Sequence, residues 1–191
     1  MSNLKQQTMK FSKLLFAAAF LTTSGLSAQI YVGKTCEASF FSASPLENIE
    51  AVAKVPKIFL NTSTNDVKIE IANTAFVFEK PLMQEHFNEN YMESEKFPKT
   101  TFMGKINEKV DFTQEGEHKV TVTGKLNMHG VEKEITVPGL VVTKGGELSI
   151  STKFRVHIAD YNIKVPSLYV QNIAEDVDVK LNGVLVAFKK N

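Results

Sequence analysis

Apolar and polar residues alternate along nearly all of the chain after residue 30, and this period of two is what most restricts its fold. From 119 to 127, for example, one face carries Val120, Val122 and Leu126, and lysine and threonine fill most positions of the other. The same alternation recurs at 131–137, 148–158 and 176–181. Strands of antiparallel sheets that bury one face and expose the other alternate in this way.

Further strands are expected earlier in the chain, at 34–42, 48–53, 57–61 and 66–79, with another near Thr101. Short turn signals such as Asn65-Asp66, His129-Gly130 and Gly145-Gly146 separate the strands. The apolar face changes parity near Asn73 and again near Gly183, and such changes predict bulges or bends that let a sheet curl. About eight strands with short connections predict an all-β fold, an eight-stranded antiparallel barrel of the lipocalin kind, which has no exposed edges.

One stretch between the strands reads differently. Pro81 suits the first position of a helix, and the four-residue spacings that follow it place Met83, Phe87 and Tyr91 on one face. We expect a helix of about two turns, closed before Pro98 and lying near one end of the barrel.

Residues 1–28 have the form of a secretory signal peptide. Three lysines without an acidic residue precede an apolar run from Leu14 to Leu26, and small residues follow up to Ala28. The run is short for a membrane span, although an uncleaved anchor is the competing interpretation. Cleavage before Gln29 would leave residues 29–191 as one domain, periplasmic or secreted, with no stable membrane span.

Removal of that segment changes the formal net charge from +1 to −2, which argues against nucleic-acid partners. The single cysteine, Cys36, has no internal disulfide partner and lies in an alternating segment, so we interpret it as a small buried hydrophobe rather than a reactive thiol. The sequence leaves the oligomeric state open, and a dimer is possible.

Chemistry-bearing motifs are scarce. The four histidines have no zinc-site spacing, so we expect no metal and no cofactor, with His118 and His157 on solvated faces and His129 in a turn. Asp160-Tyr161 is a weak candidate for a catalytic pair, because an aspartate at a strand end also bonds its own backbone. No nucleophile elbow or phosphate loop is present, and the prediction is that the protein is not an enzyme.

The apolar residues are more informative. Eleven of the 14 phenylalanines follow residue 28, and several gather around the expected helix together with Met83, Met92 and Met103. Such residues around one opening suit a long hydrophobic ligand, and equally they could simply fill the barrel. The candidate cavity residues are Phe76, Phe78, Leu82, Met83, Phe87, Phe97, Phe102, Val122, Leu126, Ile150 and Phe154.

Three stretches together resemble the YceI-like family of secreted, lipocalin-shaped proteins. They are LMQEHFNENYMESEKFPKTTFMGKI (82–106), GKLNMHGVEKEITVP (124–138) and FRVHIADYNIKVPSLYVQNIAEDVDVKL (154–181). The resemblance keeps their order and spans nearly all of the chain after the leader. The chain departs from the family pattern at Met92-Glu93-Ser94-Glu95, where an aromatic-rich segment is usual, and in a compact hairpin at 43–46.

The resemblance implies an eight-stranded barrel with a long hydrophobic cavity, no shared catalytic residues, and binding of a polyisoprenoid or fatty-acyl lipid as carrier, store or sequestering protein. The alternative is a non-enzymatic envelope-stress or protein-interaction barrel with a filled core.

Overall fold

A computed structural model describes residues 29–43, 48–164 and 174–189, so the expected signal peptide lies outside the described residues. The strands are β1 (Ile30–Ser42), β2 (Ile49–Ala53), β3 (Lys57–Asn61), β4 (Asp66–Ala72), β5 (Val77–Phe78), β6 (Lys99–Ile106), β7 (Gly116–Met128), β8 (Val131–Lys144), β9 (Glu147–His157) and β10 (Asp176–Ala187). The helical elements are α1 (Pro81–His86), the π-helical η2 (Phe87–Tyr91), and the 3₁₀ turns η1 (Asn73–Ala75) and η3 (Ile158–Tyr161).

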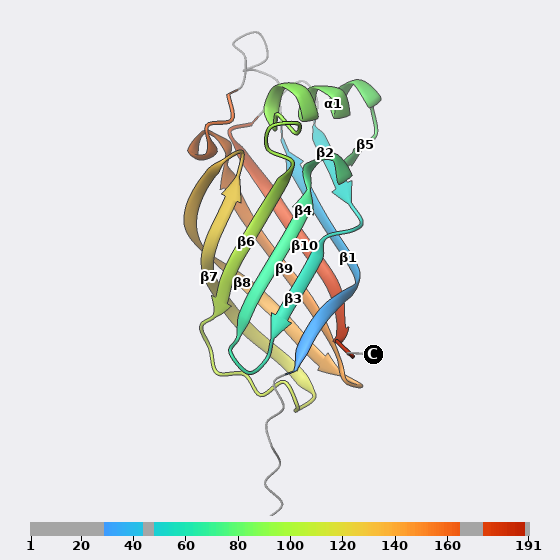
Figure 1. The fold of residues 1–191 in the computed structure, drawn as a ribbon, viewed down its shortest axis with the longest axis vertical. Coiled ribbons are helices and arrows are strands. Elements are labelled where there is room, and N and C mark those ends of the chain that lie inside the picture. Colours follow the sequence, from blue (N-terminus) through green and yellow to red (C-terminus); the bar gives the residue numbers. More distant parts are fainter. Residues whose placement is uncertain (1–28, 44–47, 165–173, 190–191) are drawn as a thin grey trace, which may run out of the picture.

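These strands form one antiparallel sheet that closes on itself where β10 pairs with β1 (Figure 1). β2 and β3 act as one interrupted strand, because β1 pairs with both in a single register, Val32 with Phe59 and Ala38 with Ala53. β4 and β5 likewise continue one another and pair with β3 and β2. Counted in this way the barrel has eight strands, which confirms the predicted fold class.

At Asn73, where the apolar face changes parity, the strand is interrupted. The 3₁₀ turn η1 separates β4 from β5, so the range 66–79 is not one continuous strand but bends where the sequence predicted a bend. A β-bulge lies in β1, between Gly33 and Thr35, opposite β10.

The second predicted bend, near Gly183, is wrong. β10 runs without interruption from Asp176 to Ala187, and Leu181 and Leu185 are both buried on one face. Gly183 instead leaves room for the thiol of Cys36, since a Cβ at this position would lie 2.8 Å from Cys36 Sγ. Cys36 is buried, as interpreted from the sequence, and burial raises the pKa of its thiol.

The predicted hairpin turns form through residues with positive φ. His129 (φ 51°) and Gly130 (φ 73°) join β7 to β8, and Gly145 (φ 58°) and Gly146 (φ 77°) join β8 to β9. Two successive positive φ angles match the right-handed twist of the flanking strands. The connections between these long strands are therefore as short as the sequence predicted.

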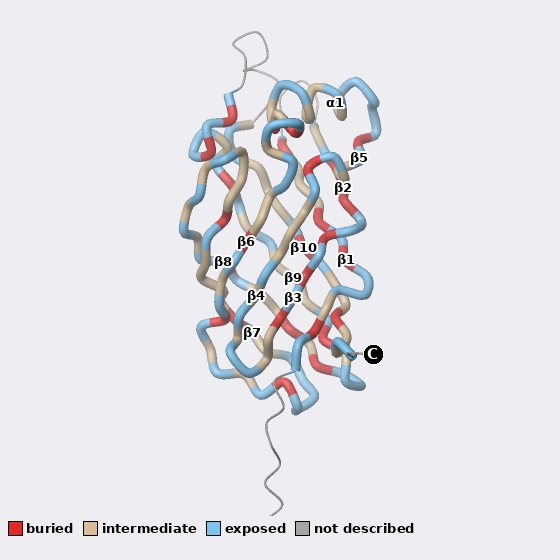
Figure 2. Tube along the Cα trace, in the orientation of Figure 1, coloured by how far each residue is buried: buried red, intermediate tan, exposed pale blue. Residues whose placement is uncertain are grey.

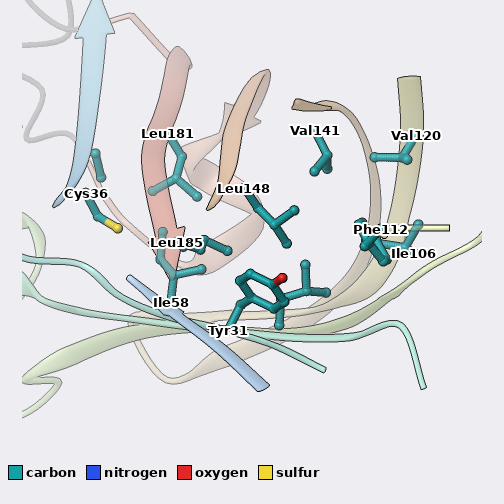
Figure 3. Packing of buried hydrophobic residues seen from close by; sticks show 12 residues of the cluster. Tyr31, Cys36, Ile58, Ile106, Phe112, Val120, Val141, Leu148, Leu181 and Leu185 are labelled. Carbon is teal, nitrogen blue, oxygen red and sulfur yellow. The ribbon is translucent and has the colours of Figure 1, made fainter. Parts of the chain in front are cut away.

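Buried residues alternate with half-buried and exposed ones along the strands (Figure 2), as expected where every second side chain points into the barrel. One cluster includes Tyr31, Phe112, Leu148 and Leu185, and Figure 3 shows these side chains converging from several strands and from the loop after β6. It lies toward the end of the barrel opposite α1, where β1 begins (Figure 1). This cluster fills that end of the barrel.

Helix α1 and η2 lie at the other end of the barrel (Figure 1). Together they span Pro81–Tyr91, which is longer than the expected two turns because the π-helical turn η2 continues α1. Pro81 occupies the start of α1, where its missing N–H costs nothing. No helix among the described residues is long and apolar enough to cross a membrane.

Candidate ligand-binding site

An apolar cavity of about 770 Å³ occupies the barrel between α1 and the buried cluster at the opposite end. Its wall is the inward face of the strands, for example Ile69 and Ile71 of β4 and Val177 and Val179 of β10. Alternation along each strand places these side chains inside, while charged residues such as Lys68 and Glu70 point outward. The interior is therefore only partly filled, and the predicted barrel has space for a small ligand.

Four phenylalanine rings, from β1, η2, β5 and the residue that precedes β5, meet at the α1 end of this cavity. Phe87 of η2 lies 5.5 Å from Phe40 of β1, 5.7 Å from Phe76 and 5.1 Å from Phe78, measured between ring centroids. Phe40 also contacts Phe76 and Phe78 edge-on, at 5.3 and 5.8 Å. These distances lie within the favourable range for aromatic pairs. The four rings, which we call the phenylalanine cluster, attach the helix to the barrel wall.

Asn73 fixes the loop that leads back from η2 into β6. It is fully buried, its Nδ2 donates to the backbone oxygen of Phe97 at 2.6 Å, and its Oδ1 accepts from the Thr100 hydroxyl at 2.9 Å. Its backbone N–H donates to the oxygen of Pro98 at 3.0 Å. A buried amide with these bonds satisfied holds one loop geometry. The sequence indicated Asn73 only as the position of a bend, and its burial and hydrogen bonds are visible only in the structure.

The structure brings together ten of the eleven candidate cavity residues in one wall. From the α1 end these are Phe76, Phe78, Leu82, Met83 and Phe87, and from β6, β7 and β9 they are Phe102, Val122, Leu126, Ile150 and Phe154. Leu82 lines the rim and is 60% exposed, so the cavity reaches the surface beside α1. Contact of these residues with a ligand stays a prediction.

Phe97 is the exception, because it lies outside the cavity wall. Its ring packs against the His129 ring, with centroids 4.6 Å apart, and beneath the ammonium group of Lys96. A Cβ on Gly130 would lie 2.5 Å from the Phe97 ring, so the glycine permits this contact. The loop between η2 and β6 thus directs Phe97 onto the β7–β8 turn, a placement that proximity in sequence to α1 did not reveal.

His129 links three parts of the α1 end of the barrel. Its Nδ1 lies 3.0 Å from the backbone oxygen of Tyr161 in η3, and its Nε2 lies 2.8 Å from Oε2 of Glu93. A backbone carbonyl only accepts hydrogen bonds, so Nδ1 carries the proton of the first contact. His129 is a turn residue, as expected, and it also joins the turn to η3 and to the loop after η2.

The residues that the sequence analysis missed follow a simple rule of parity. Val137, Val156 and Leu181 all line the cavity, and each faces inward because it shares parity with buried neighbours on its strand. Met103, which was expected near the opening, is 61% exposed because it faces outward beside Lys68 of β4. Selecting every second residue on the inward side of each strand would have identified more of the cavity wall than selecting segments rich in aromatic residues.

The weaker chemical candidates have structural roles. Asp160 pairs with Lys133 at 2.8 Å, and the hydrogen bond from this lysine lowers the pKa of the carboxyl group. Tyr161 is buried, which raises the pKa of its phenol. His118 is not fully solvated as expected: its ring lies 6.3 Å from Phe112, and its Nε2 is buried without a partner. No group of three or more potential metal ligands occurs among the described residues.

Solved structures with this architecture support the description of the fold. A polyisoprenoid-binding domain from Saccharophagus degradans implicated in plant cell wall breakdown matches with a TM-score of 0.71 at 13% identity, covering 85% of this chain and all of the other. Burkholderia cenocepacia BcnA matches with a TM-score of 0.66 at 16% identity, over 79% of this chain and 96% of that one. A Campylobacter jejuni YceI protein gives 0.51 at 18% identity, over 98% and 100%.

No match is found among curated protein sequences. The model of the YceI-like domain, however, matches residues 35–185, which is most of the chain and includes all or most of every strand of the barrel. The sequence match and the barrel agree, and the chain therefore belongs to the YceI-like family.

Proposed function

We propose that this protein is an exported, non-enzymatic carrier or store that holds a hydrophobic or amphiphilic small molecule inside its barrel. The observation that carries the proposal is the cavity of about 770 Å³, whose wall is almost entirely aliphatic and aromatic. A cavity of this size and polarity matches sites for lipid-like small molecules, for which removal of apolar surface from water supplies the affinity.

A polyisoprenoid or a fatty-acyl lipid is the ligand class that we favour. The wall has few hydrogen-bonding groups, and those at the α1 end include Lys80, His86 and Tyr91. A long chain with one polar end would place its hydrocarbon along the barrel and its polar group near these side chains. The polyisoprenoid-binding domain that shares this fold supports the ligand class by analogy.

Export is the second part of the proposal. It rests on the signal-like composition of residues 1–28, and mass analysis of the exported protein should find a chain that begins within a residue or two of Gln29. A filled barrel that acts only through its outer surface, the alternative considered from the sequence, is less well supported, because the two buried clusters leave an apolar cavity of about 770 Å³ that residues of both clusters line.

Native mass spectrometry of protein purified from its own host tests the ligand claim. We expect the folded protein to carry a co-purifying lipid whose mass identifies an isoprenoid or an acyl chain. Folded protein that carries no lipid, and that binds neither fatty acids nor prenols when these are added, would contradict the proposal.

A further inference from the structure

The wall between β8 and β9 is bonded over only part of its length. The two strands pair from Leu140 opposite Ser151 to Lys144 opposite Glu147, at the end of the barrel away from α1. Toward α1, residues 131–139 and 152–157 do not pair with each other. Each strand is held on its other edge, β8 by β7 and β9 by β10. The separation is therefore a gap within the wall, and we call it the β8–β9 window.

The chain closes this window with side chains in place of backbone ladder bonds. At its lower edge the Thr152 hydroxyl donates to the backbone oxygen of Pro138 at 2.6 Å, and Pro138 has no N–H to offer β9. At its upper edge Lys133 pairs with Asp160 at 2.8 Å. Side chains change rotamer far more readily than a strand ladder opens, so the window can widen without loss of backbone pairing.

The cavity extends into this gap. Pro138 and Gly139 of β8 and Thr152 of β9, which border the unpaired stretch, all line the cavity, although Pro138 lies on the outward side of its strand and is exposed. Gly139 contributes no side chain to cover the gap. The empty space therefore reaches between the two backbones.

Besides the opening beside α1, the window is a second route by which a chain that outgrows the cavity can leave the barrel. Along the barrel axis the buried side chains of Tyr31, Phe112, Leu148 and Leu185 block the end opposite α1. On the outer face of β8, below the window, Pro138 is exposed and Leu140 and Val142 are half-buried, so an apolar surface continues outside. A hydrocarbon chain that left through the window would remain in contact with apolar groups.

We propose that the β8–β9 window is a second opening of the lipid site, through which the far end of a long chain leaves the barrel. The inference rests on the proposed lipid-binding function and narrows the ligand class to amphiphiles whose chains exceed the cavity. The polar end stays beside α1, and the far end lies against Pro138 and Leu140.

Affinity as a function of chain length tests this opening. Fatty acids from decanoate to docosanoate would be titrated into the wild type, into Ser151→Trp, and into the matched control Ser149→Trp. Both serines face outward on β9, but Ser151 borders the window, whereas Ser149 pairs with Val142 in the bonded part of the wall. Ser151 lines the edge of the cavity at the window, and a tryptophan there would extend its ring along the outer side of the wall and cover the window.

For the wild type and for Ser149→Trp, affinity should rise by up to about fourfold per added methylene and then level off without falling. Ser151→Trp should match them for short chains and bind the longest at least about tenfold more weakly. Two results would refute the proposed second opening. One is a wild type that does not bind the longest chains, and the other is a Ser151→Trp variant whose affinity equals that of the wild type at every chain length. If the folded wild type bound no fatty acid of any length, the proposed lipid-binding function would be refuted, together with the second opening that rests on it.

A second measurement does not depend on the bulky variant. Ser151→Cys and Ser149→Cys, each in a Cys36→Ala background, would carry a fluorophore while stearate with a nitroxide on its terminal carbon binds. Quenching should be much stronger at position 151 than at 149, and stearate with the nitroxide beside the carboxylate should quench neither. Equal quenching at both positions by the terminal label would refute the proposal.

Discussion

Phe87→Ala separates the two roles that the phenylalanine cluster can have. Phe87 is the central ring, since it contacts Phe40, Phe76 and Phe78, and it also lines the cavity. If the cluster only attaches α1 and η2 to the barrel, the substitution lowers stability alone. If it also contacts a lipid chain, the substitution lowers affinity as well.

The expected magnitudes follow from these contacts. Three aromatic pairs, at about 0.5–1.5 kcal/mol each, give a loss of unfolding free energy of about 1.5–4.5 kcal/mol. This is somewhat below the range for a fully buried phenylalanine, because Phe87 is only half-buried. Loss of apolar contact with a ligand, at roughly 25 cal/mol per Å², should weaken lipid binding by about 1–3 kcal/mol, or about ten- to a hundredfold.

Urea denaturation and lipid titration on the same preparations measure both quantities. Phe112→Ala is the matched control, because Phe112 is buried in the closed end of the barrel and does not line the cavity. It should lose stability with little change in affinity per folded molecule. Met83→Asp sharpens the test, since a carboxylate at an apolar rim is poorly solvated and should weaken binding further. If lipid affinity were unchanged in both Phe87→Ala and Met83→Asp, the helix would not be part of the binding site.

Three further predictions concern stability. Asn73→Ala should cost about 2–3 kcal/mol in urea denaturation, because it leaves the Phe97 carbonyl without its buried donor, and a loss below the error of the measurement would contradict this role. Cys36→Ala should cost on the order of 1 kcal/mol and leave lipid affinity intact, and rapid thiol labelling of native protein would argue against burial. Lys153 and Arg155 hold the pKa of Asp178 below its ordinary value, so its stabilisation is present above about pH 4 and is lost as the pH falls toward the folded-state pKa. Asp178→Asn should therefore be less stable than wild type at pH 7 but not in strong acid, and an equal deficit at both pH values would refute this linkage.

Local chemistry explains why much of the barrel could be read from the sequence. Alternation fixes which side of a strand is buried, so the strands at 57–61 and 119–127 and the inward faces of Val122, Leu126, Ile150 and Phe154 follow from it. The His129-Gly130 and Gly145-Gly146 turns require positive φ, which few other residue pairs adopt readily. These signals act between neighbours in the chain.

Other features depend on contacts between distant segments, which no local pattern records. Phe97 lies outside the cavity because Gly130, which has no side chain, leaves room for its ring. Gly183 leaves room for the Cys36 thiol and does not mark a bend. Asn73 is buried where it forms hydrogen bonds with Phe97 and Thr100. The unpaired stretch between β8 and β9 was not predicted either, although Pro138, which has no backbone N–H to donate to β9, lies at its edge. The sequence thus determined the strands, their faces and the class of fold, while only the closed barrel decided which side chains meet, how much of the interior stays empty and where its wall can open.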